Sequence, residues 1–151
     1  MIQYILASSI LFATWSLSPD QKEELRSDYT KFVSDKKLCK DWMNKLNAVD
    51  HKDAAEIAYL GALSAIWANH VFSPFEKLST FKKGKELIER AVKMKPDDIE
   101  VRFVRYSIQK KAPSMLNYRA NITEDYNFLS KNKEKVESST LKVLINRALT
   151  E

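Results

Sequence analysis

The chain has 151 residues, of which 44% are hydrophobic and 11% aromatic. That length and apolar content suit one ordinary domain with its own core, and they exclude a disordered chain. Only two glycines and four prolines are present, and the Asn-Gly, Asp-Gly and Gly-Gly pairs that favour tight hairpins are missing from the sequence. The composition therefore predicts long helices and excludes a hairpin-rich sheet.

The charge distribution argues against a nucleic-acid partner. The 25 basic and 20 acidic side chains leave a net charge of +5, and the basic residues stand in short groups such as Lys36-Lys37 and Lys82-Lys83 among acidic ones. A weak attraction to acidic partners follows from this charge. No nucleic-acid recognition motif accompanies it, so we predict no nucleic-acid binding.

The N-terminal segment is apolar and carries no charged side chain over residues 1–19. Its apolar run, residues 2–15, is shorter than the ~20 residues that a membrane-spanning helix needs. We predict a cleaved export signal over residues 1–17 and a folded domain over residues 18–151, in the periplasm or otherwise associated with the cell envelope, with no integral membrane span after processing. The alternative is that this segment is the first buried helix of a cytoplasmic domain.

The first two predicted helices of the domain are amphipathic. Residues 18–21 (SPDQ) have the pattern of a capping box with proline in the first turn, which predicts a helix over residues 19–34. A second helix over residues 36–48 carries an apolar stripe that includes Cys39, the only cysteine. A single cysteine allows no internal disulfide.

The third predicted helix, residues 57–71, is uncharged along its whole length. A helix without a polar face has no side to present to water. Small residues such as Gly61 and Ala65 recur along it and allow neighbouring helices to approach closely. We therefore expect other helices to enclose it.

A fourth helix is predicted from a second capping pattern at residues 73–76 (SPFE) to Lys95, where Pro96 ends it. Residues 97–111 fit both a strand and a helix, because their apolar residues match both periods. We predict a helix, since acidic residues favour a helix start and no partner strand is expected.

The C-terminal part begins with a break at residues 112–114 (APS). The following surface segment is expected to turn Met115, Leu116 and Tyr118 inward. Asn121 is predicted to cap a short helix. A last helix is predicted over residues 133–149.

Several positions of the third and fourth predicted helices match a known repeat: Tyr59-Leu60-Gly61, followed by Gly84, Ile88, Ala91 and Pro96. This pattern resembles one tetratricopeptide (TPR) unit. The resemblance implies an all-α domain of TPR-like stacked antiparallel hairpins, with about six or seven helices, that binds a protein partner. The two glycines are 23 positions apart, farther than in the family pattern, which predicts lengthened helices.

TPR proteins that grip a peptide carboxylate use basic and amide side chains on the inner face of the first helix. The matching positions here are all apolar: Ala55, Ala58, Ala62, Ala65 and Ile66. The resemblance therefore implies no carboxylate clamp. Residues 56–129 are also similar to small exported bacterial helical proteins without an assigned function, which implies export but supplies no activity.

The motifs of most enzyme classes are missing from the sequence. Two isolated glycines cannot form a phosphate-binding loop, and no nucleophile elbow or zinc-ligand spacing is present. His51 beside Asp53 and Glu56 suggests either a metal site or a polar loop with a helix cap, of which we favour the cap. A thiol nucleophile formed by Cys39 and a histidine is disfavoured. We predict no catalytic residue, metal site or cofactor.

The strongest polar cluster lies on and after the fifth predicted helix. Its candidate binding residues are Arg102, Arg105, Tyr106, Gln109 and Tyr118. Guanidinium groups on one helix side could bind an anion or an acidic peptide. The alternative, which we favour, is that the arginines pair with Glu124 and Asp125 and anchor the irregular segment between residues 112 and 121.

These patterns favour a non-enzymatic protein–protein interaction or assembly module of the bacterial cell envelope. The second hypothesis is a helical bundle that binds a small molecule or lipid in a pocket lined by Trp42, Trp67 and Phe75. A helical enzyme of unrecognised type is the third.

Overall fold

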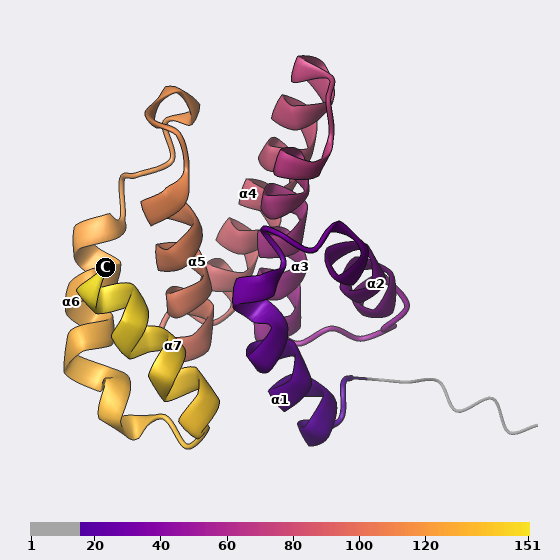
Figure 1. The fold of residues 1–151 in the computed structure, drawn as a ribbon. Coiled ribbons are helices and arrows are strands. Elements are labelled where there is room, and N and C mark those ends of the chain that lie inside the picture. The colour runs from indigo at the N-terminus through magenta and orange to yellow at the C-terminus, as the bar shows by residue number, and fades with distance from the viewer. Residues whose placement is uncertain (1–15) are drawn as a thin grey trace, which may run out of the picture.

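The computed structural model describes residues 16–151, and within this range the chain forms seven α-helices, four single-turn 3-10 helices and no strand (Figure 1). The α-helices are α1 (Pro19–Asp28), α2 (Lys36–Asn47), α3 (Ala54–Trp67), α4 (Pro74–Met94), α5 (Ile99–Lys111), α6 (Ile122–Asn132) and α7 (Ser139–Thr150). The predicted all-α, single-domain fold is confirmed. Nearly all of the predicted export segment lies outside the described residues.

The centre of the molecule is the antiparallel hairpin formed by α3 and α4 (Figure 1). The two backbones touch where Gly61 faces Gly84. A Cβ atom added to Gly61 would lie 2.7 Å from the Gly84 carbonyl oxygen, and one added to Gly84 would lie 2.6 Å from the Ala65 nitrogen. Only glycine at both positions permits this approach without a shift of backbone.

Helix α3 is enclosed by its neighbours, as its uncharged sequence predicts. Every residue from 57 to 66 is buried. The helix begins earlier than predicted because Asp53 caps it and forms a capping box with Glu56, which confirms the cap interpretation of this acidic cluster. It also ends earlier, at Trp67, and residues 67–71 are only half-buried or exposed.

The other helices cover the hairpin on two sides (Figure 1). Helix α2 packs on α3, while α5 packs on both α3 and α4 and carries α6 and α7 on its outer side. An aromatic junction holds these layers together, because Tyr29 packs edge-on against Tyr59 and Phe103 with ring centroids 5.4 and 5.7 Å apart. The junction therefore fixes α3 and α5 relative to the chain after α1.

Two residues of the predicted export segment fall within the described part. The side chain of Leu17 is buried in the core, and its amide N–H donates to Oε1 of Glu56 at 2.7 Å. Ser16 donates to the same oxygen at 2.6 Å. A cleavage of the predicted export signal that leaves Leu17 in the core would therefore have to occur before this residue.

Several predicted helix ends need correction. The first helix stops at Asp28, and a 3-10 turn (Tyr29–Lys31) replaces its last part. The last helix begins at Ser139, after the Ser138 cap, because residues 133–135 form a separate 3-10 turn. Asn121 is the N-cap residue of α6, but its side chain makes no capping hydrogen bond. The predicted fifth helix is confirmed as α5, capped by Asp98.

Candidate binding groove

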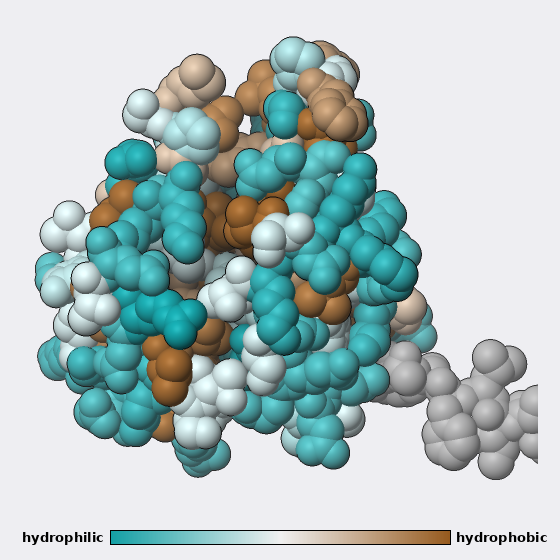
Figure 2. Space-filling view, in the orientation of Figure 1, coloured by the Kyte–Doolittle hydropathy of each residue, from teal (hydrophilic) through white to brown (hydrophobic). Residues whose placement is uncertain are grey.

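An apolar groove opens between the end of the α3–α4 hairpin and the C-terminal end of α5. We call it the α4–α5 groove and define it by six of its lining residues: Val33, Ile66, Leu78, Phe81, Ile108 and Met115. Its volume is about 660 Å³. Figure 2 shows apolar side chains, coloured brown, gathered in the hollow between the two projections at the top of the molecule. These projections correspond to the hairpin end and to the turn after α5 in Figure 1.

The hairpin side of the groove is built by the first two turns of α4. Ser73 caps the helix and Pro74 occupies its first turn, so the helix starts directly after the hairpin connection. Leu78 and Phe81 then lie three residues apart on one face. The Nζ of Lys77 donates to the Ala68 carbonyl oxygen at 3.0 Å, which ties this wall to the end of α3.

The opposite wall is the end of α5 and the turn after it. Pro113 stops the helix, and a 3-10 turn (Ser114–Leu116) follows, closed by Asn117 in the left-handed region at φ 48°. Arg119 holds this turn through a 3.0 Å hydrogen bond to the Ala112 carbonyl oxygen. Asparagine tolerates positive φ better than most residues, which suits this position.

Met115, Leu116 and Tyr118 do not all turn inward as predicted. Tyr118 is buried and Leu116 is half-buried, but Met115 is 87% exposed and lies at the edge of the groove. Met115 and Leu116 are neighbours in a single 3-10 turn, where adjacent side chains point in different directions, and only Leu116 is partly covered. The prediction for Met115 is therefore wrong.

Exposed apolar side chains are concentrated at this end of the molecule. Leu78 is 56% exposed and Val33 is also exposed, although both line the groove. Phe72 and Phe75 flank the lining residue Pro74 in the sequence, and Phe75 is 82% exposed. Large apolar patches on a protein surface commonly mark interaction sites. The hairpin connection therefore exposes further apolar side chains that are not part of the groove lining.

The charged groups at the groove are all positive. Lys77 on one wall and Lys111 on the other line it, and no Asp or Glu of the described chain does. Lys111 is exposed at the end of α5. Neither lysine forms an ion pair with a described residue. The groove is thus apolar at its base and cationic on both walls.

The arginines predicted as binding residues lie elsewhere, in the interface between α5 and α6. Asp125 is fully buried and accepts from both guanidinium groups. Arg105 binds it in a bidentate way, with Nε–Oδ2 at 2.7 Å and Nη2–Oδ1 at 2.8 Å. Arg102 also donates to Glu124 and to the Pro96 carbonyl oxygen. This is the pairing that the alternative interpretation predicted.

The other three predicted residues extend this interface. Tyr118 donates to Glu89 at 2.7 Å, and Glu89 also accepts from Arg105. Burial, reinforced by the hydrogen bond to Glu89, raises the pKa of the Tyr118 phenol.

Gln109 and Tyr106 are also buried. The side-chain amide of Gln109 donates to Oδ1 of Asn121 at 3.3 Å. A ligand would have to displace partners within the chain, so binding by these residues stays a prediction.

The three rings of the second hypothesis line neither the α4–α5 groove nor the charged pocket described below. Trp42 is buried and donates its indole N–H to Asp28 at 3.0 Å. Trp67 lies under the ammonium groups of two lysines of α2, and Phe75 is exposed. Trp42 is thus enclosed in the core while Phe75 faces solvent, and the structure gives no support to the expected lining.

The remaining candidate for chemistry is Cys39, whose thiol is buried beside the Leu63 carbonyl oxygen. Burial raises its pKa to about 12. The Nε2 of His70 bonds the Phe32 carbonyl oxygen at 2.8 Å, so this imidazole has a backbone partner. Among the described residues, no three His, Cys, Asp or Glu side chains are grouped to hold a metal ion.

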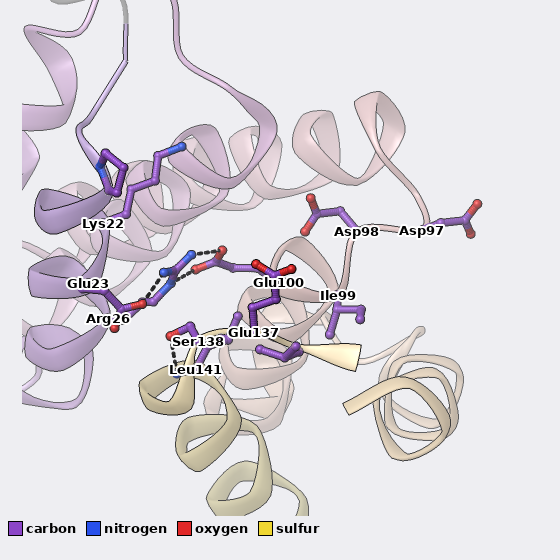
Figure 3. A pocket seen from close by; sticks show the side chains of 12 residues that line it. Lys22, Glu23, Arg26, Asp97, Asp98, Ile99, Glu100, Glu137, Ser138 and Leu141 are labelled. Atoms are coloured by element: carbon purple, nitrogen blue, oxygen red, sulfur yellow. Dashed lines mark hydrogen bonds and ion pairs between the residues drawn. The ribbon is translucent and has the colours of Figure 1, made fainter. Parts of the chain in front are cut away.

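A second pocket, of about 670 Å³, is lined by charged residues where α1, α5 and α7 begin or meet (Figure 3). Arg26 binds Glu100 through two hydrogen bonds of 2.7 and 2.8 Å, and Tyr59 donates to the same carboxylate. Asp97 points away from this pair in Figure 3, whereas Asp98 caps α5 by accepting from the Val101 amide at 3.0 Å. The central charges are thus paired within the chain and join α1 to α5.

Comparison with other proteins adds no identification. No protein-family model matches the chain. The curated proteins gave no significant match. The solved structures gave none either. Within residues 16–151, no helix has the length and apolar character needed to cross a membrane.

Proposed function

We propose that this protein is a non-enzymatic interaction module that receives an apolar segment of a partner protein in the α4–α5 groove. The observation that carries the proposal is the apolar groove itself, whose walls expose Leu78 and Met115 to solvent. Burying one such side chain contributes about 1.5–3 kcal/mol. Methionine is also enriched at interfaces, where its flexible side chain adapts to a partner.

A rigid frame behind the groove supports this role. The Gly61–Gly84 contact fixes the hairpin wall, and the Tyr29 ring packs between that hairpin and α5. Binding to a preformed surface avoids the entropy cost of ordering it. An amphipathic helix laid in an apolar groove is a common form of peptide recognition and fits this shape.

The proposal includes a TPR-like origin for the α3–α4 hairpin. It is supported by the contact between the two glycines of the sequence pattern and by the burial of Ile88 and Ala91 on α4. Stacked helical hairpins serve mainly to present binding surfaces. Finding a second hairpin of the same pattern in a homologous chain would support this part, and homologues that lack both glycines would contradict it.

We also propose that the protein works in the bacterial cell envelope. This rests on the uncharged apolar run of residues 2–15, which lies outside the described residues. Fractionation of the native host, with sequencing of the N-terminus, tests it. An intact N-terminus in the cytoplasm would contradict the proposed location and favour the cytoplasmic alternative.

A second candidate function is the binding of a small molecule or lipid. It is favoured by the groove volume of about 660 Å³, which lies within the usual range of about 300–1,000 Å³ for ligand sites. A ligand of fixed mass that co-purifies with the protein, and that is lost in Leu78→Gln, would support it.

Site-specific crosslinking in the native host tests the leading proposal. A photoreactive amino acid at Met115 should give a discrete adduct with one protein. The same probe at Val143, an exposed apolar position on α7 outside the groove, should give none. Equal adducts from both positions, or none from Met115, would contradict binding at the groove.

A further inference from the structure

We propose that the partner segment is an amphipathic helix that carries acidic residues beside its apolar anchors. This inference rests on the proposed function and adds the chemistry of the partner. It is drawn from the two lysines of the groove, Lys77 and Lys111, and from the exclusion of Asp and Glu from the described lining.

Because the two lysines lie on opposite walls, we expect acidic groups on both sides of the helix that binds in the groove. Lys77 lies on the α4 wall and Lys111 at the end of α5, so the two cations face the groove from opposite walls. Lys77 is held by the Ala68 carbonyl oxygen, whereas Lys111 is exposed and has no ion pair among the described residues. An apolar occupant without carboxylates would cover these ammonium groups and leave them without a counter-charge, which is unfavourable.

The same charges disfavour two other occupants. The apolar N-terminal run has no charged side chain to pair with either lysine. A second copy of the chain, packed groove to groove about a two-fold axis, would bring two pairs of lysines together on a protein whose net charge is already +5. A helix is the form that places apolar anchors three and four residues apart and acidic residues along both edges.

Three synthetic peptides test the inference on the full chain. They share one apolar face and differ only in the flanking positions, which are all Glu, all Gln or all Lys. A length of about 18 residues allows helix formation, and the three residue types have similar helix propensities. The Glu peptide should bind about tenfold more tightly than the Gln peptide, and the Lys peptide most weakly. The preference should shrink at high salt.

Charge variants locate the effect. Lys111→Glu should weaken binding of the Glu peptide and strengthen binding of the Lys peptide. Lys131→Glu makes the same change in net charge on the exposed face of α6, outside the groove, and should leave the order of the three peptides unchanged. An equal effect of both variants would indicate long-range attraction and would overturn the role of the groove lysines.

The remaining outcomes distinguish a failure of the acidic-partner inference from a failure of the proposed function. Equal binding of all three peptides, lost in Leu78→Gln, would overturn the acidic partner and keep the apolar groove. Binding of none would overturn both. Three results would assign the groove to another occupant: a Leu78-dependent dimer in sedimentation, a crosslink from position 115 to residues 1–15 of the same chain, or Leu78-dependent binding of oleate that the Glu peptide does not displace.

Discussion

The two ends of α5 differ in how their side chains are paired. Near its start and middle, the charged side chains form hydrogen bonds with partners on α1, α4 and α6; they are Glu100, Arg102 and Arg105. At its end, Ile108 and Lys111 line a groove whose apolar walls stay partly open to solvent. The first region satisfies every charge it buries and so stabilises the fold. The second leaves apolar area and positive charge available, which is the property of a binding surface.

The largest effect is expected from breaking the α5–α6 interface at its centre. Asp125→Ala removes the carboxylate shared by two buried guanidinium groups and should lower the free energy of unfolding by about 3–5 kcal/mol. Glu124→Gln, at a side chain that is mostly exposed, should cost no more than about 1 kcal/mol. Urea unfolding measures both. A cost below about 1 kcal/mol for Asp125→Ala would show that this interface is not a stabilising region.

The next largest effect on stability is expected in the α3–α4 hairpin, which forms the other wall of the groove. Gly84→Ala should destabilise the protein by about 1–3 kcal/mol, because the new Cβ meets the backbone of Ala65. Ser79→Ala, at an exposed position of the same helix, should be neutral or slightly stabilising because of helix propensity. Thermal unfolding of the pair checks this. Stabilisation by both substitutions would contradict the close packing of α3 and α4.

A pH-dependent effect is expected from Tyr118. Its folded-state pKa is raised above the ordinary value of 10.0 by burial and by the hydrogen bond to Glu89. A raised pKa contributes stability that is complete below pH 10 and is lost as the pH rises through the folded-state pKa. Tyr118→Phe should cost about 1–3 kcal/mol at pH 7 and should flatten the fall in stability above pH 10. An unchanged alkaline slope would contradict this assignment.

The smallest effect on stability is expected in the groove. Met115→Gln should change the free energy of unfolding by no more than about 0.5 kcal/mol, because its side chain is already in water. Chemical unfolding of this variant beside Asp125→Ala compares the two regions directly. A loss of several kcal/mol would mean that Met115 packs in the folded state and that the groove is closed in solution.

Signals that depend on a few neighbouring residues predicted the helices well. The capping patterns at Ser18 and Ser73 and the uncharged run of α3 depend on neighbours in sequence, and the structure follows them. The spacing of Arg102 and Arg105 also placed them on one helix side, and their acidic partners were identified.

The groove was not predicted, because its shape depends on where separate helices end in space. Leu78 fits the apolar stripe of α4, yet it is exposed since the hairpin end extends past the helices that cover the rest. Met115 lies in a single 3-10 turn, which is too short for a periodic apolar pattern to indicate which side chains face inward. The signal available in the sequence was limited to a methionine two residues after Pro113 and to Lys77 and Lys111, which have no Asp or Glu three or four residues away.

The most direct test of the account is binding of the Glu-flanked peptide to wild type, Leu78→Gln and Val143→Gln, with unfolding measured on the same samples. Leu78 and Val143 are similarly exposed, at 56% and 58%, but only Leu78 lines the groove. The account predicts that Leu78→Gln weakens binding about tenfold or more, that Val143→Gln does not, and that both keep wild-type stability. Equal binding by all three proteins would contradict it.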